Sequence, residues 1–346
     1  MGFQCGTNFA SCHAIVIISA VSLVTINSES LLVSNLKKPA NSTSDCSFLV
    51  IADWGGNEDS PYTTPDEVYV AKQMGVIGST IGANFILALG DNFYTYGVKD
   101  ADDKRFQETF ENVFTADSLQ VPWYVLAGNH DWYGNVTGEI AYTEKSSRWN
   151  FPTNYYSLNF SIPGTNDSLI ILMLDTVILA GNSYDELNIP PSGPEEIAAA
   201  EKQWTWIKDQ LEATRNEKYV LVAGHYPVWS IAEHGPTDLL VSQLRPLLEK
   251  YRVNSYLCGH DHNLQHIREV NGTVEYFVVG AAHVIDGSVK HMNSVPKGSL
   301  RYHYANPKGM GAFSYFEVWS DGIQVTFADG IAGKDLYSAL IKPRIF

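Results

Sequence analysis

The chain has 346 residues, of which 45% are hydrophobic and 18% are charged, and its 38 acidic and 23 basic side chains give a formal net charge of −15. A chain of this length and apolar content can bury a full core, which excludes a disordered protein. The acidic balance and the lack of a run rich in Lys and Arg exclude nucleic acid as an expected partner. The composition therefore indicates a globular protein of one large domain or two ordinary ones.

An apolar run covers residues 14–26, close to the N-terminus. It is shorter than the ~20 residues that a membrane-spanning helix needs, and its length is typical of a secretory signal peptide. We therefore expect residues 1–30 to be a signal peptide, with an uncleaved anchor as the alternative, and we expect no stable membrane span. Residues 31–45 are mostly polar and contain Pro39, which predicts a solvated lead-in segment.

Asn-x-Ser/Thr sequences favour a secreted or lysosomal glycoprotein, because they accept N-linked glycans in the secretory pathway. They occur at Asn41, Asn135, Asn159, Asn166 and Asn271. Beyond the leader the chain keeps only Cys46 and Cys258. A domain of this size does not need disulfides, and we expect none here.

From residue 46 onward, short apolar runs alternate with helical patterns. The runs are typical of buried strands and lie at 48–51, 85–89, 123–127, 219–223 and 255–258. Thr64 and Glu67 predict a capping box at the start of a helix, with Pro65 at its first position. A second helix is expected over 194–215.

The second expected helix has an apolar stripe that should face the core. Its members are Ile197, Ala200, Trp204, Ile207 and Leu211. Hairpins are predicted around residues 163–167, at Asn271-Gly272 and at Asp321-Gly322. The pattern predicts mixed sheets with helices packed outside, in one domain over residues 46–346.

Each of the five predicted strands ends in residues that can bind a metal. The segments are Ala52-Asp53, Gly90-Asp91-Asn92-Phe93-Tyr94, Gly128-Asn129-His130-Asp131, Gly224-His225 and Gly259-His260-Asp261-His262. A single such segment is more often a turn, a helix cap or a core residue. Because ligands gather at the carboxyl ends of strands, five of them together predict a dinuclear metal site.

The spacing of these residues suggests how two metals would share them. Asp91 and Tyr94 are three residues apart, so a helical turn would place both on one face and allow them to share a metal. His260 and His262 are two apart, so in an extended chain they point the same way, about 6 to 7 Å apart. That separation suits two ions ~3.5 to 4 Å apart, and Asp91 is the central candidate for a bridging carboxylate.

The five motifs resemble those of the metallophosphoesterases. Tyr94, together with residues 220–237 and 256–263, makes the chain similar to the small, mammalian-type purple acid phosphatases, from about residue 46 to the C-terminus. The resemblance implies an α/β metallophosphoesterase sandwich of two mixed β-sheets flanked by helices, and a single catalytic domain over 46–346. It also implies an acid phosphatase that hydrolyses phosphomonoesters, either small molecules or phosphopeptides, by metal-activated water or hydroxide.

The resemblance further implies a set of metal ligands. One metal would be held by Asp53, Asp91, Tyr94 and His262, and the second by Asp91, Asn129, His225 and His260. The oxygen-rich first set suits Fe(III), and a tyrosinate on Fe(III) would give a visible charge-transfer band. The second set suits Fe(II), Zn(II) or Mn(II).

Two histidines outside the ligand set face the substrate in this family. They correspond to His130 and His234, either of which could protonate the leaving alcohol. The remaining histidines beyond the leader match none of the five motifs and are interpreted as structural or surface residues: His266, His283, His291 and His303.

Mammalian members have a cysteine pair beside the active site, at positions that correspond to Ala180 and Asp238 here. Without that link, residues 181–196, a repression loop in the family, should be more mobile. Two other functions remain open. One is a dinuclear-metal phosphodiesterase, which Tyr94 disfavours. The other is a secreted iron-binding or phosphate-binding glycoprotein with incidental turnover, which His130 and His234 disfavour.

Overall fold

The computed structural model describes residues 46–162, 164–187 and 189–345. The predicted signal peptide, the lead-in segment and Asn41 lie outside these residues. Within them, none of the helices combines the length and the apolar character that crossing a membrane requires.

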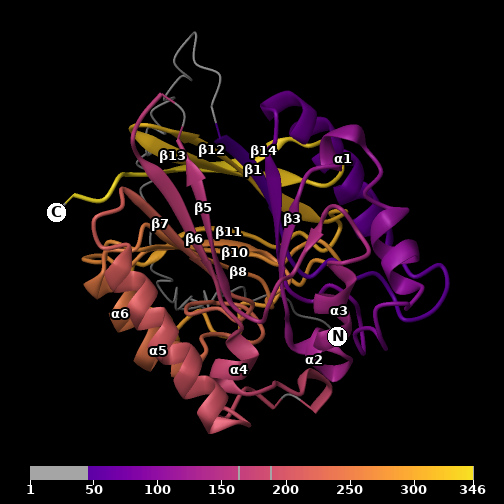
Figure 1. The fold of residues 1–346 in the computed structure, drawn as a ribbon, viewed down its shortest axis with the longest axis horizontal. Coiled ribbons are helices and arrows are strands. Elements are labelled where there is room, and N and C mark those ends of the chain that lie inside the picture. The colour runs from indigo at the N-terminus through magenta and orange to yellow at the C-terminus, as the bar shows by residue number, and fades with distance from the viewer. Residues whose placement is uncertain (1–45, 163, 188, 346) are drawn as a thin grey trace, which may run out of the picture. The chain divides into compact units, whose positions relative to one another are not determined.

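The first of two seven-stranded sheets has the strand order β14-β13-β12-β1-β2-β3-β4 (Figure 1). Its strands β1 to β4 run parallel to one another, while β12, β13 and β14 are antiparallel to their neighbours. The strands are β1 (Cys46–Ile51), β2 (Phe85–Leu89), β3 (Trp123–Leu126), β4 (Trp149–Asn150), β12 (Ala312–Trp319), β13 (Gly322–Asp329) and β14 (Asp335–Ile341).

The second sheet has the order β11-β9-β10-β8-β7-β6-β5 and is also mixed, because β6, β7, β8 and β10 are parallel and the others antiparallel. Its strands are β5 (Tyr156–Ser161), β6 (Ser168–Met173), β7 (Tyr219–Ala223), β8 (Ser255–Cys258), β9 (Leu264–Ile267), β10 (Glu275–Val279) and β11 (Leu300–Tyr304). The two sheets confirm the predicted sandwich. Cys46 and Cys258 lie in different sheets, as buried free thiols.

Strand β6 shows why the predicted strands are almost continuously apolar. Leu169, Ile171 and Met173 pack into the core between the two sheets, whereas Ile170 and Leu172 pack against the helices outside. Both faces of the strand are therefore buried, and each such side chain contributes ~1.5 to 3 kcal/mol through its removal from water.

Helix α1 (Pro65–Ile81) begins with the predicted capping box. The Glu67 N–H donates to the Thr64 hydroxyl oxygen at 3.1 Å, and the Thr64 N–H donates to the Glu67 carboxylate at 3.2 Å. The other helices are α2 (Asn129–Tyr133), α3 (Val136–Tyr142), α4 (Thr176–Ala180), α5 (Ile197–Ala213) and α6 (Arg245–Lys250). Helices α5 and α6 cover the outer face of the second sheet (Figure 1).

Helix α5 differs from its prediction at the N-terminal end. It begins at Ile197 and not at residue 194, and Ile197 is 66% exposed although it was predicted on the core-facing stripe. As the first residue of the helix, Ile197 lies before the part that packs on the sheet. Trp204, Ile207 and Leu211 are buried there, as predicted.

Candidate metal centre

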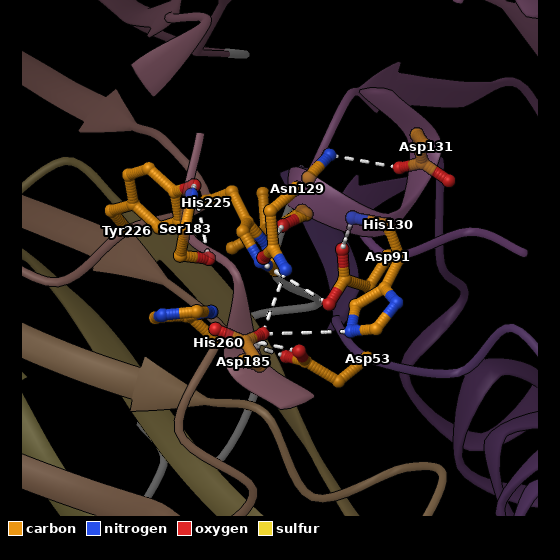
Figure 2. A network of polar contacts seen from close by, with 12 residues as sticks. Asp53, Asp91, Asn129, His130, Asp131, Ser183, Asp185, His225, Tyr226 and His260 are labelled. Atoms are coloured by element: carbon orange, nitrogen blue, oxygen red, sulfur yellow. Dashed lines mark hydrogen bonds and ion pairs between the residues drawn. The ribbon is translucent and has the colours of Figure 1, made fainter. Parts of the chain in front are cut away.

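The carboxyl ends of five strands bring the predicted site together. Asp53, Asp91 and Asn129 follow β1, β2 and β3 of the first sheet, and His225 and His260 follow β7 and β8 of the second (Figure 2). None of these five side chains is more than 3% exposed. So many buried polar groups must be paired with one another or with a bound ion.

Glycines precede several of these residues because neighbouring side chains lie too close to the backbone there to leave room for a Cβ atom. A Cβ on Gly128 would lie 2.2 Å from Asp91 Oδ1, and a Cβ on Gly259 would lie 2.3 Å from Asp53 Oδ2. Asp53, Asp91 and His260 themselves have positive φ angles of 52°, 52° and 70°. Left-handed backbone is costly for residues other than glycine, so conformational strain is concentrated at this site.

The predicted ligands form two groups that share Asp91. Nitrogen or oxygen atoms of Asp53, Asp91 and His262 all lie within 4.8 Å of one another, and so do atoms of Asp91, His225 and His260. Asp91 is therefore placed to bridge two metals.

Tyr94 and Asn129 complete the two groups. The Tyr94 hydroxyl lies 3.1 Å from Asp53 Oδ1 and 3.0 Å from His262 Nε2. Asn129 Oδ1 lies 3.0 Å from His225 Nε2. All seven predicted ligands are thus adjacent, in one group rich in anionic oxygen donors and one rich in nitrogen donors.

The chemistry of these donors fits two metal ions. His225 Nδ1 lies 2.9 Å from the carbonyl oxygen of Leu89, which orients the ring so that Nε2 faces Asp91 and Asn129, where a metal would bind. The first group offers two carboxylates, a phenol and an imidazole. The second group offers a carboxylate, an amide oxygen and two imidazoles, so the two sets favour metals of different hardness.

Two local predictions at the site are wrong. The segment from Asp91 to Tyr94 forms bends and turns and no helix, and Tyr94 is positioned by a hydrogen bond from its N–H to the carbonyl of Gly55. The His260-Asp261-His262 segment is not extended, because His260 has a φ of 70°. The two histidines nevertheless belong to different groups.

The charges in the cluster depend on one another. Burial alone would raise the pKa of Asp91, but the neighbouring His225 and His130 hold it below its ordinary value. Burial would lower the pKa of His225, and Asp91 instead raises it to about 10. Burial, together with Asp53 and Asp91, raises the pKa of Tyr94 far above its usual range. A tyrosinate at this position therefore requires a cation beside it.

His130 and His234 border the two groups and remain open to solvent. The His130 N–H donates to Asp91 Oδ1 at 3.0 Å, and its ring Nδ1 lies 2.7 Å from the carbonyl of Thr95. The His234 ring stacks on His260 with centroids 4.0 Å apart. Their side chains are 13% and 30% exposed.

Asp185 is a residue of the site that the sequence did not single out for this role. It begins a short 3-10 turn, and its carboxylate points into the cluster (Figure 2). Asn129 Nδ2 donates to it at 2.8 Å, and His130 Nε2 and His234 Nδ1 lie 3.6 and 3.8 Å away. Burial would raise the pKa of Asp185, but His130, His260 and His234 lower it. A lone acid in a loop carries no sequence signal for this contact.

The loop over residues 181–196 is anchored without the cysteine link. The Ser183 N–H donates to the Tyr226 hydroxyl oxygen at 3.0 Å, and Tyr184 stacks on Tyr133 with centroids 6.3 Å apart. The Gly193 N–H donates to the carbonyl of Ala180 at 2.8 Å. These contacts hold Asp185 against the site.

His283, interpreted from the sequence as structural or surface, packs beside the site. Its ring packs on Tyr94 with centroids 4.3 Å apart and lies 6.1 Å from the His262 ring. Burial and the neighbouring His262 lower its pKa to about 3. It follows none of the five motif strands directly, which is why the motifs do not include it.

A buried carboxylate supports the turn that carries Asn129. Asp131 accepts hydrogen bonds from the N–H groups of Gly128 at 2.8 Å and Asn92 at 3.0 Å. Asn92 Nδ2 in turn donates to Glu139 at 3.1 Å. Burial and the charge of Asp91 raise the pKa of Asp131 to about 7.

Comparison with known folds defines the class of protein. Residues 46–264 match the family described as calcineurin-like phosphoesterase. The solved structure of GAP50, the anchor in the inner membrane complex of Plasmodium, has a TM-score of 0.72 at 21% identity, over 87% of this chain and 89% of that chain. A dimetal phosphatase from Danio rerio has a TM-score of 0.58 at 15% identity, over 86% and 99%. The fold and the double cluster are those of a metallophosphoesterase.

Relatives with similar sequences show which family of metallophosphoesterases the chain belongs to. The human tartrate-resistant acid phosphatase type 5 is 53% identical over 298 residues, which cover 86% of this chain and 91% of the relative. Purple acid phosphatase 7 of Arabidopsis thaliana is 33% identical over 77% of this chain and 79% of its own. The chain belongs to the purple acid phosphatase family.

Proposed function

We propose that the protein is an acid phosphatase that hydrolyses phosphomonoesters at a dinuclear centre of Fe(III) and a divalent metal, which is Fe(II), Zn(II) or Mn(II). The observation that carries the proposal is the pair of donor groups sharing Asp91, with Tyr94 in the oxygen-rich group. The relatives named as acid phosphatases support it.

In this proposal Asp53, Asp91, Tyr94 and His262 would hold Fe(III), and Asp91, Asn129, His225 and His260 would hold the divalent metal. When bound, such a centre supplies the positive charge that binds phosphate and makes water acidic enough to act as the nucleophile. The acidic surface of the chain therefore does not exclude an anionic substrate.

His130 and His234 are the proposed proton donors to the leaving alcohol. Each has one ring nitrogen directed toward Asp185, in the space beside the donor groups: Nε2 of His130 and Nδ1 of His234. The Nδ1 atom of His130 is occupied by the contact with Thr95, which leaves Nε2 for the substrate. Positioned acids of this kind contribute roughly 10²- to 10⁴-fold to a rate.

The loop over residues 181–196 is proposed to repress activity. Asp185 occupies hydrogen-bond positions on Asn129 and beside His130 that a phosphate oxygen would need. Displacement or cleavage of the loop would therefore release residues of the site.

We further propose a secreted or lysosomal glycoprotein with a signal peptide over residues 1–30. Asn159, Asn166 and Asn271 are exposed and Asn135 is partly exposed, so their side chains are accessible to glycan attachment.

A visible spectrum, a metal analysis and hydrolysis assays from pH 4 to 8 on the purified protein test the proposal together. We expect bound iron, a broad visible band, and acid hydrolysis of p-nitrophenyl phosphate in preference to bis(p-nitrophenyl) phosphate. Tyr94→Phe should lose the band and keep the fold. A colourless, iron-free protein without acid activity would contradict the proposal, and preferential diester hydrolysis would favour the phosphodiesterase.

A further inference from the structure

A cavity of 630 Å³ opens beside the metal centre. Its lining includes Trp229, residues 233–238 and Val241, together with Lys290 and His291, and it reaches the metal centre at His260. Because His234 and Asp185 also line it, a substrate with its phosphate at the metal centre would place its organic part in this side cavity. Its volume is that of a site for a drug-sized ligand and exceeds what a phosphate group alone would fill.

The side cavity has apolar walls held by the surrounding structure. Trp229 is 8% exposed and donates from Nε1 to Glu269 at 3.1 Å, so its ring is fixed. Pro236 and Val241 add further apolar surface outside the loop over residues 181–196, so this part of the wall remains when the loop is displaced. The Ile231 N–H donates to Gln265 Oε1 at 2.9 Å, which fixes the chain between Trp229 and Pro236. An apolar segment of substrate could enter with little rearrangement.

The charges at the side cavity are unequal. Glu233 accepts from Lys290 at 2.7 Å and from the Ser288 hydroxyl at 2.9 Å, so this carboxylate is neutralised by its partners. Asp238 is exposed at the wall, and among the residues that the structure describes its carboxylate has no ion-pair partner. Of the carboxylates that line the cavity, Asp185 faces His130 and His234, and Asp238 is therefore the one without an ion-pair partner among the described residues.

We propose that the side cavity binds the peptide part of a phosphopeptide in which an apolar stretch lies beside the phosphorylated residue and a Lys or Arg follows within a few residues to pair with Asp238. This inference rests on the proposed phosphatase function and names the class of substrate for the same site. The apolar walls would favour the apolar stretch of the peptide, and Asp238 would favour the Lys or Arg. Because the carboxylate is exposed, its contribution is modest and is screened by salt.

Matched phosphopeptides test the inference. The peptides are identical except for Arg, Gln or Glu two to four residues from the phosphorylated residue, and the readout is the ratio of kcat/KM for the Arg and Glu peptides. We expect wild type to favour Arg, and Asp238→Lys to lower the ratio by about two- to fivefold. Asp209→Lys on α5 is the control, because Asp209 is exposed and the change in net charge is the same. The wild-type preference should shrink in 0.5 M NaCl.

An equal change in the ratio for Asp238→Lys and Asp209→Lys would overturn the inference, because the preference would then come from net charge alone. A wild-type ratio near one would overturn it too. Dissociation constants for the same peptides with a non-hydrolysable phosphonate give the charge preference without turnover. If those constants show the preference while no phosphomonoester is hydrolysed, the proposed function fails and the peptide site stands.

Discussion

The side-chain amide of Asn129 donates a hydrogen bond of 2.8 Å to the carboxylate of Asp185, and this bond joins the metal centre to the loop over residues 181–196. A negative group thereby lies where a negatively charged substrate should bind. The loop does not depend on a disulfide for this contact, because Ser183 and Gly193 are held by hydrogen bonds of their own.

Asp185→Ala should raise kcat/KM for p-nitrophenyl phosphate, because it removes a carboxylate that competes with the phosphate. One charged hydrogen bond of about 1.5 kcal/mol corresponds to roughly a tenfold change. Steady-state kinetics on the intact chain measure it, with Glu195→Ala, an exposed acid of the same loop, as the control. Unchanged or lower kcat/KM in Asp185→Ala would show that the loop does not repress.

Asp91→Ala should lose both metals and all turnover together, because Asp91 belongs to both donor groups. Metal analysis after dialysis and the p-nitrophenyl phosphate assay measure the two losses, and circular dichroism checks that the variant is folded. Asp321→Ala, in the exposed turn between β12 and β13, is the control and should keep both. Retention of two metals by folded Asp91→Ala would refute the bridging position.

His234→Ala should keep the metals and the visible band while the rate falls by roughly 10²- to 10⁴-fold, because a proton donor is removed and no ligand is lost. The measurements are metal content, spectrum and the pH profile of kcat. His130→Ala, tested in parallel, shows how the two histidines divide the role. If His234→Ala leaves the rate and its pH profile intact, His234 is not the acid.

Glu67→Gln should make stability less dependent on pH. Burial raises the pKa of Glu67 well above its ordinary value, so the folded state holds the proton to higher pH than the unfolded state. The stabilisation is complete below the unfolded pKa and is lost as the pH rises toward the folded pKa. A glutamine keeps the acceptor for the Thr64 N–H without the charge.

Urea unfolding at pH 4 and pH 7 tests this. The free energy of unfolding of Glu67→Gln relative to wild type should be greater at pH 7 than at pH 4. Glu58→Gln, an exposed glutamate, should show no such difference. An equal effect at both pH values would mean that the pKa of Glu67 is the same in the folded and unfolded states, so that burial does not raise it.

The helices and strands whose ends are set by neighbouring residues in the chain could be predicted from the sequence. The capping box of α1 involves Thr64 and Glu67, which are three residues apart, and the strand from Phe85 to Leu89 matches its prediction at both ends because a strand buried on both faces is apolar throughout. The prediction that Ile197 faces the core was wrong, because the apolar pattern of a helix does not show where the sheet beneath it ends.

Within the site, the positions of Asp53, Asp91, Asn129, His225 and His260 were predictable because each lies just after a buried strand, and strand ends converge in this class of fold. The backbone angles of Asp91 and His260 were not predictable, because they depend on contacts far apart in the chain: Asp91 lies against Gly128, and the His260 N–H donates to Asp53.

The sequence by itself determined that an acidic, globular chain carries candidate metal ligands in five strand-end motifs. Only the tertiary structure decided which residues surround them. None of the five motifs contains Asp185, His283 or Asp238. Their positions depend on how the loops pack across the ends of both sheets. Contacts between residues far apart in the chain have no local pattern, whereas a buried strand and its polar end do.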